Sequence, residues 1–232
     1  MDEEDRLMAE YWRKIIREDL DDFRTYISNP AIFQRINLIG ENNVVLDAGC
    51  GEGYLSRYIS EKNNEVVGID ISPRRVQLAK KYSDTEMYQV ASIYELPFDD
   101  CHFDVIICNF VLIELEDLEK ALIELKRVLK NDGKIIVQHL NPNYILFTEG
   151  VEYSKEDVTK YRQKFVVSGY ESPYSTVWFN HSKQKYYDLF KLIGLQIDFE
   201  SYPKPAHEIP KSSDIYSFRD EKWCWLFELK KE

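Results

Sequence analysis

The sequence predicts an α/β fold, in which a parallel β-sheet carries helices on both faces. Between about residue 44 and residue 139, short aliphatic runs alternate with amphipathic stretches, and such alternation favours a parallel sheet with crossover helices. The first aliphatic run ends in a turn with three glycines in five positions, Gly49, Gly51 and Gly53. Glycine lets backbone approach a bound ligand closely, so this strand, loop and helix together indicate a cofactor cradle.

The elements are expected in the following order. Helices are predicted over 3–20, over 23–38 with an interruption near Asn29-Pro30, from the glycine turn to about 60, over 72–82, around 118–129 and over 182–193. Strands are predicted over 44–46, 65–70, 86–90, 103–109, 134–139, 195–200 and 223–229. Ser72 is expected as an N-cap with Pro73 in the first turn, and Ser182 as a second N-cap. The turn Asn131-Asp132-Gly133 should end the fifth helix, and Gly194 the last one.

The segment after the fifth strand breaks this pattern. Residues 143–181 are rich in aromatic side chains and contain no clear strand–helix–strand unit. We expect a helix over 154–163 and a hairpin or pair of loops over 165–179. A long loop with three prolines should fill 202–219.

Charge argues against a nucleic-acid partner. The net charge is −11, whereas a protein that grips phosphates needs a basic surface. The basic pairs Arg74-Arg75, Lys80-Lys81 and Lys126-Arg127 lie among acids on predicted helices, which favours solvated helix faces. Polymeric nucleic acid is therefore a disfavoured substrate.

Neither the N-terminus nor any apolar run indicates a membrane or secretory protein. The chain starts with acidic residues, the opposite of a secretory leader, and no apolar run reaches the length of a membrane span. The four cysteines form no CxxC pair and the four histidines have no metal-ligand spacing. We therefore expect free thiols, no metal site and a cytoplasmic location.

Ligands of an open parallel sheet bind at the carboxyl ends of its strands. The segments at those ends are 47–53, 70–71, 91–93, 109–111 and 139–141. A dinucleotide-binding loop would read G-x-G-x-x-G, but here the third glycine comes one position early. Asp47, two residues before the first glycine, is also not part of that pattern.

The run Leu-Asp-Ala-Gly-Cys-Gly-Glu-Gly at 46–53 resembles the motif of the class I S-adenosylmethionine-dependent methyltransferases, especially the small-molecule type of methyltransferase domains 11 and 25. The resemblance covers roughly residues 42–137. It implies a Rossmann-like, doubly wound sheet of seven strands, mostly parallel with an antiparallel last strand. It also implies S-adenosyl-L-methionine as cofactor and S-adenosyl-L-homocysteine as product. Residues 1–40 would then form a helical lid, 41–141 the cofactor-binding core, 142–181 a substrate cap and 182–232 the C-terminal helix and strands of one domain.

The resemblance also assigns roles around the cofactor. Asp70 matches the acid that binds both ribose hydroxyls, since a carboxylate can accept from a diol at two positions. Ile71 and Ile93 would lie against the adenine. Ser92 stands where the family usually has the aspartate that accepts from the adenine amino group. The complete set of expected cofactor residues is Tyr11, Trp12, Asp47, Gly49, Cys50, Gly51, Gly53, Asp70, Ile71, Ser92, Ile93, Asn109 and Phe110.

A methyl acceptor that is protonated needs a base, and three side chains are candidates. His139 ends the fifth strand and its neutral imidazole is a base near pH 7, although a hydrogen-bonded structural histidine is an equal alternative. Glu114 and His181 are the other two, and Asn109 is a candidate ligand of the acceptor. We expect the acceptor to be a small molecule methylated on oxygen or nitrogen. The alternatives are a cofactor-binding sensor or partner subunit without catalysis, and an RNA or protein methyltransferase. The sequence leaves the oligomeric state open.

Overall fold

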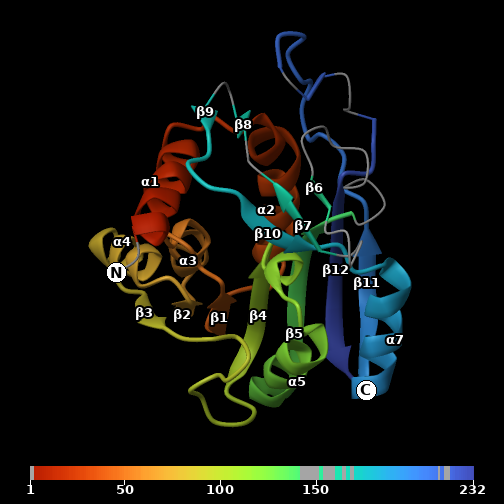
Figure 1. Ribbon diagram of the computed structural model, residues 1–232. Coiled ribbons are helices and arrows are strands. Elements are labelled where there is room, and N and C mark those ends of the chain that lie inside the picture. The colour runs from red at the N-terminus through yellow and green to blue at the C-terminus, as the bar shows by residue number, and fades with distance from the viewer. Residues whose placement is uncertain are drawn as a thin grey trace.

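The computed structural model describes residues 3–141, 152–153, 160–163, 166–167, 170–213, 215–216 and 220–232. Seven strands form one mixed sheet in the order β11-β12-β5-β4-β1-β2-β3 (Figure 1). Their bounds are β1 Val44–Ala48, β2 Glu65–Asp70, β3 Met87–Val90, β4 Phe103–Asn109, β5 Leu129–Leu140, β11 Leu195–Ser201 and β12 Cys224–Lys231. The pairs among β1 to β5 are parallel, while β12 runs antiparallel to both β5 and β11. The expected doubly wound sheet with an antiparallel last strand is confirmed.

Helices cover both faces of this sheet. They are α1 Glu3–Arg17, the π-helix η1 Arg24–Ser28, α2 Asn29–Asn37, α3 Tyr54–Ser60, α4 Pro73–Lys81, the 3-10 helix η2 Leu112–Glu114, α5 Leu118–Val128 and α7 Lys183–Ile193. α5 and α7 lie in front of the sheet in Figure 1.

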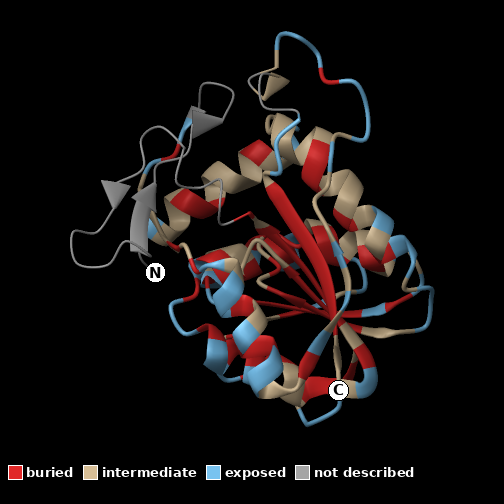
Figure 2. Cartoon of the chain, turned by 90° about the vertical axis from the view of Figure 1, so that its right-hand side faces the viewer, coloured by how far each residue is buried: buried red, intermediate tan, exposed pale blue. Residues whose placement is uncertain are grey.

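The side chains along each strand alternate between the two faces of the sheet, and this divides the core into two layers. Leu46 and Ile106 pack in the cluster that contains side chains of α5 and α7, whereas their neighbours Val45, Val105 and Ile107 pack with α2 and α3. Successive residues of a strand point to opposite faces, so one run of apolar residues serves both layers. Figure 2 shows buried residues concentrated along the strands between the helices.

Several local predictions are confirmed by the backbone. The Ser72 hydroxyl accepts from the Arg75 amide at 3.0 Å, and that of Ser182 accepts from the Lys185 amide. Gly194 ends α7 in the left-handed region. Pro30 lies in the first turn of α2, where a proline is tolerated although it has no N–H to donate. The interruption predicted near Asn29-Pro30 corresponds to the change from the π-helix η1 to α2.

Two predictions were wrong. α5 ends at Val128 and β5 starts at once at Leu129, because the chain pairs with Phe103 of β4 before the turn Asn131-Asp132-Gly133 is reached. The helix expected over 154–163 is contradicted by β7, Lys160–Gln163, while residues 154–159 lie outside the described part.

β7 is a strand because two partners supply its backbone hydrogen bonds. It pairs with β10, Thr176–Phe179, and with β6, Glu152–Tyr153. Part of the hairpin expected over 165–179 is present, as β8 Val166–Val167 pairs with β9 Tyr170–Glu171. Within the part of the chain that the structure describes, no helix is both long and apolar enough to cross a bilayer.

Candidate cofactor and active site

The glycine loop follows β1 and turns sharply over the end of β2. Gly49 and Gly53 have φ angles of 80° and 82°, a region that favours glycine. A Cβ on Gly49 would lie 2.2 Å from a methyl of Val111, and one on Gly53 would lie 2.5 Å from the Tyr88 hydroxyl. A Cβ on Gly51 would meet nothing within 4 Å, so the middle of the loop faces open space.

Asp70 links this loop to the end of β2. One of its carboxylate oxygens accepts from the Gly51 amide at 3.0 Å and the other accepts from the Ser72 amide at 2.9 Å. The Arg75 guanidinium lies 3.9 Å away. Although Asp70 is 5% exposed, the adjacent Ile71 is 73% exposed. A fixed carboxylate beside an uncovered aliphatic side chain fits the ribose and adenine roles that the sequence predicts for this pair.

Asp47 lies beneath the loop, buried in the sheet. The Ser56 hydroxyl donates to its carboxylate at 2.6 Å. Burial raises the pKa of Asp47 to about 6, an effect that the Ser56 hydrogen bond opposes and the neighbouring Asp70 reinforces. Cys50 is also buried, and desolvation raises the pKa of its thiol.

The third strand end is less open than expected. The Ser92 hydroxyl already accepts from the Tyr94 amide at 3.2 Å. Ile93 is 8% exposed and packs in the main core, which leaves little of it to cover a ligand. Packing therefore argues against the expected adenine contact of Ile93, whereas the side chain of Ile71 is exposed.

The end of β4 carries a polar cluster that the sequence revealed only in part. The Asn109 amide nitrogen donates to the Tyr54 hydroxyl at 3.1 Å, and the Asn109 amide oxygen is buried without a hydrogen-bond partner in the described residues. Phe110 adopts φ 57°, an uncommon left-handed conformation, and its ring lies 6.0 Å from that of Phe23. Tyr54 is not among the site residues predicted from the sequence. Its position directly after Gly53, at the end of the glycine loop, was the signal that could have identified it.

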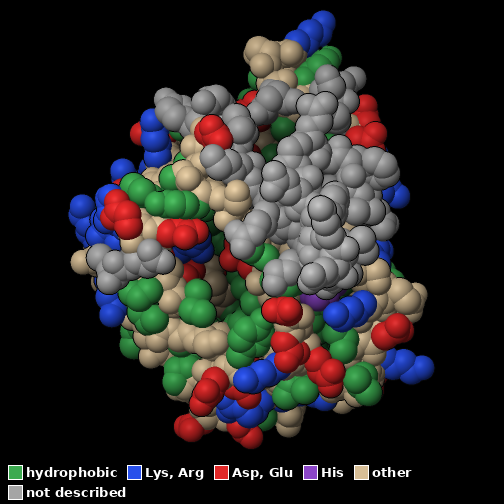
Figure 3. Space-filling model, viewed as in Figure 1, with side chains coloured by type: hydrophobic (Ala, Val, Ile, Leu, Met, Phe, Trp, Pro, Cys, Tyr) green, Lys and Arg blue, Asp and Glu red, His purple; other side chains and the backbone are tan. Residues whose placement is uncertain are grey.

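Glu114 shares this region with Asp70 and Arg75. Its side chain reaches solvent, yet desolvation raises the pKa of its carboxyl. The Arg75 charge opposes that rise and Asp70 adds to it. Figure 3 shows a hollow containing acidic and basic side chains, near the position at which Figure 1 draws α3 and α4.

The two candidate histidines lie elsewhere. His139 is 1% exposed; its Nε2 lies 2.9 Å from the Tyr186 hydroxyl and its Nδ1 contacts the Leu140 carbonyl. Burial lowers the pKa of His139 to about 4. His181 is buried too, with Nε2 at 2.8 Å from the Leu115 carbonyl. Both rings have the contacts of structural histidines, which favours the structural alternative for His139 and argues against either ring as the base.

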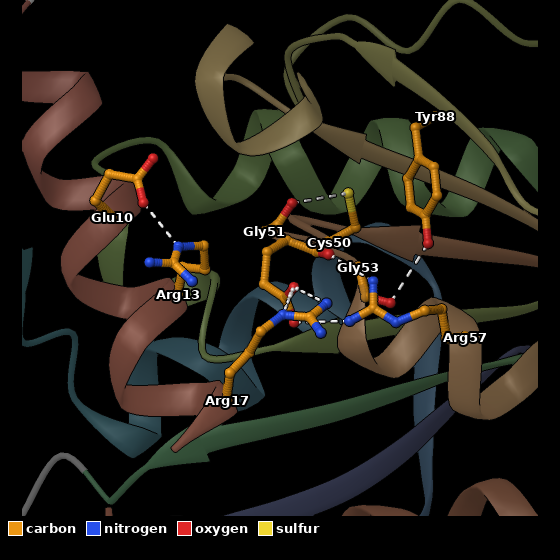
Figure 4. Close-up of polar contacts among 9 residues, drawn as sticks. Glu10, Arg13, Arg17, Cys50, Gly51, Gly53, Arg57 and Tyr88 are labelled. Carbon is orange, nitrogen blue, oxygen red and sulfur yellow. Dashed lines mark hydrogen bonds and ion pairs between the residues drawn. The ribbon is translucent and has the colours of Figure 1, made fainter. Parts of the chain in front are cut away.

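The N-terminal helix α1 is tied to the loop by a buried carboxylate. Glu52, between the last two glycines of the loop, is 4% exposed and pairs with Arg17 at 2.9 Å and with Arg57 at 2.7 Å (Figure 4). The Arg17 guanidinium also lies over the Tyr82 ring, 3.6 Å from its centroid. Arg57 comes from α3 and Arg17 from α1, so this one acid joins three segments.

The other end of α1 is attached to α4. Glu10 pairs with Arg74 at 2.5 Å, and Asp5 accepts from the Ser72 hydroxyl. Tyr11 and Trp12 lie on α1, with their rings edge to face and 5.2 Å apart. The helix thus passes over the glycine loop with contacts at both ends, in a position suited to a lid.

Comparison with known proteins agrees with this geometry. Residues 46–137 match a family profile described as a methyltransferase domain. The chain is 34% identical over 110 residues to the malonyl-[acyl-carrier protein] O-methyltransferase of Hamiltonella defensa, a match that covers 47% of this chain and 43% of that protein. It is 36% identical over 113 residues to the ubiquinone/menaquinone biosynthesis C-methyltransferase UbiE of Citrifermentans bemidjiense, covering 45% and 48%. The chain spans about half the length of the curated relatives that it matches.

Solved structures share the fold over most of the chain. A chain in the complex between the Haloferax volcanii Trm112 methyltransferase activator and a methyltransferase has a TM-score of 0.68 at 23% identity, covering 100% of this chain and 98% of that one. The PH0226 protein of Pyrococcus horikoshii has a TM-score of 0.66 at 20% identity, covering 88% and 87%. Residues 46–137 of this chain thus match a methyltransferase domain, and the chain shares its fold with these solved structures.

Proposed function

We propose that the protein binds S-adenosyl-L-methionine at the carboxyl ends of β1 and β2 and transfers its methyl group to a small-molecule acceptor. The observation that carries this proposal is the Asp70 carboxylate, which the Gly51 and Ser72 amides hold in place beside the exposed Ile71. A carboxylate oriented by backbone amides is ready to accept from the two hydroxyls of a ribose.

The residues around the loop fit the remaining parts of such a cofactor. The open side of Gly51 allows close approach of its amino-acid end, and the buried Asp47 adds negative potential below the loop. Tyr11 and Trp12 on α1 would cover it. When bound, the cofactor supplies an electrophilic methyl group on a sulfonium, and the protein's part is to align the acceptor and exclude water.

On the acceptor side we propose Asn109 and Glu114. The buried Asn109 oxygen lacks a partner in the described residues, so it can accept from an acceptor hydroxyl or amine. Glu114 has a raised pKa, which makes its carboxylate a stronger base than an ordinary glutamate. We infer an oxygen or nitrogen acceptor from these groups, and the O-methyltransferases among the relatives support it. The four free cysteines suit a reducing compartment, which supports a cytoplasmic enzyme.

Two measurements test the proposal. Isothermal titration with S-adenosylhomocysteine should show binding to the wild type and a loss of about 10-fold or more in Asp70→Asn, because the variant gives up a charged acceptor. Asp198→Asn, an exposed acid paired with Lys230, is the matched control and should bind as the wild type does. Incubation with methyl-labelled cofactor and a metabolite extract should then yield a labelled small product.

The outcomes separate the alternatives. If S-adenosylhomocysteine does not bind the wild type, the cofactor assignment is wrong. If it binds but no extract of small molecules, RNA or protein becomes labelled, the non-catalytic sensor is the better description. Labelling of RNA or protein alone would overturn the small-molecule acceptor.

A further inference from the structure

Four arginines lie around the glycine loop, and three of them already have carboxylate partners. Arg17 and Arg57 share the buried Glu52 carboxylate, at 2.9 and 2.7 Å. Arg75 lies 3.9 Å from the Asp70 carboxylate. The charges of these three side chains are therefore engaged in holding the loop and its neighbouring acid.

Arg24 is the fourth. Its side chain is half-buried, and its guanidinium lies over the Tyr54 ring, 4.3 Å from the ring centroid. The Arg24 guanidinium makes no ion pair or hydrogen bond with any residue of the described ranges. The hydrogen bonds of Arg24 come from its backbone: its amide donates to the Asp21 carboxylate at 3.2 Å and its carbonyl accepts from the Asn29 amide. A partly desolvated guanidinium whose donors are not engaged by those residues favours an anionic ligand that can accept from two of them at once.

The surroundings hold this guanidinium at the cofactor cradle. Tyr54 immediately follows Gly53, and its hydroxyl contacts Asn109 at 3.1 Å and Asn29 at 3.4 Å, so the ring beneath Arg24 is fixed from two sides. Arg24 itself starts the π-helix η1, an uncommon element that often occurs at functional sites. These contacts set the position of the cation before any ligand arrives.

We propose that Arg24 binds the carboxylate of the amino-acid end of the cofactor. This inference rests on the proposed function, in which the glycine loop receives that end while Asp70 and Ile71 receive the ribose and adenine. Of the groups on the cofactor, the carboxylate is the one whose charge and planar shape match a guanidinium. The sulfonium carries the same charge as Arg24, which would disfavour its approach.

The test compares two ligands that differ in this carboxylate. Titration calorimetry with S-adenosylhomocysteine and with its decarboxylated analogue is performed on the wild type, Arg24→Met and Arg24→Lys. Because Arg24→Met loses a charge-assisted hydrogen-bonded pair, its affinity for S-adenosylhomocysteine should fall by about 10- to 100-fold. The same variant should bind the decarboxylated analogue as the wild type does, and Arg24→Lys should recover part of the loss. Arg6→Met, which removes an exposed arginine paired with Glu3, is the matched control.

The outcomes distinguish this inference from the proposed function. Failure of the wild type to bind S-adenosylhomocysteine would refute the proposed function. Binding by the wild type and equally by Arg24→Met would overturn the role of Arg24 alone. If Arg24→Met lowers the affinity for both ligands to the same extent, Arg24 stabilises the loop and does not bind the carboxylate, so the assignment also fails.

Discussion

Replacing Asp47 with asparagine should stabilise the unliganded protein at neutral and alkaline pH. Asp47 is 2% exposed and has one hydrogen bond from Ser56, at 2.6 Å. Its pKa is raised from 3.8 to about 6, so the folded state carries a carboxylate that burial disfavours. The neutral amide introduced by Asp47→Asn has nearly the same shape and can keep the bond from Ser56 through its oxygen.

The magnitude follows from the pKa change. Because one pKa unit corresponds to about 1.4 kcal/mol, a rise of about two units costs roughly 3 kcal/mol of folding free energy once the group is ionised in both states. The folded pKa lies above the unfolded one, so the cost is absent below about pH 3.8, grows between that pH and about 6, and is complete above it. An unpaired amide nitrogen in the Asp47→Asn variant would offset the gain by ~1 kcal/mol. We therefore expect a net gain of ~2 kcal/mol at pH 8 and a net loss of ~0.5 kcal/mol at pH 4, because the cost of the unpaired amide nitrogen applies at both pH values.

Urea denaturation of the wild type and Asp47→Asn across this pH range measures the difference directly. Asp104→Asn is a control of opposite sign: burial raises the pKa of Asp104, but the hydrogen bonds from Lys130 and from the Val44 amide outweigh it and leave the pKa lowered. That variant should lose stability relative to the wild type as the pH rises above the unfolded pKa. If Asp47→Asn is destabilised equally at pH 4 and pH 8, the reasoning from desolvation is refuted.

Three further predictions concern the core, the loop and the lid. His139→Gln should lower the melting temperature but leave the pH profile of turnover unchanged, because the imidazole is buried and its pKa is lowered to about 4; a shifted profile would restore His139 as a base. Gly49→Ala should destabilise the fold by about 1–3 kcal/mol and weaken cofactor binding, since the new Cβ would lie 2.2 Å from a methyl of Val111; a melt and titration equal to those of the wild type would contradict this. Arg17→Met should weaken cofactor binding and make it less salt-dependent, because α1 loses its ion pair with Glu52; the check is a titration at low and at high salt, in which identical affinities of both proteins would count against the lid.

The order of elements and the position of the glycine loop could be predicted from local patterns. Aliphatic runs marked the strands, and Ser72 and Gly194 marked helix ends through bonds to residues only a few positions away. Asp70 and the glycines could be placed because parallel strands bring their carboxyl ends to one edge of the sheet. The sequence by itself therefore determined the sheet, the loop and the acid beside it.

The tertiary structure decided which side chains these elements bring into contact. His139 ends the expected strand, but the tertiary structure buries its ring against Tyr186 of a later helix, which favours a structural role. β7 is a strand because its hydrogen-bond partner β10 lies further along the chain, against the helical pattern of its own residues. The link from Arg17 to Glu52 and the position of the Arg24 charge over Tyr54 likewise depend on neighbours distant in sequence. Burial and charge pairing depend on three-dimensional packing, which periodicity and spacing do not encode.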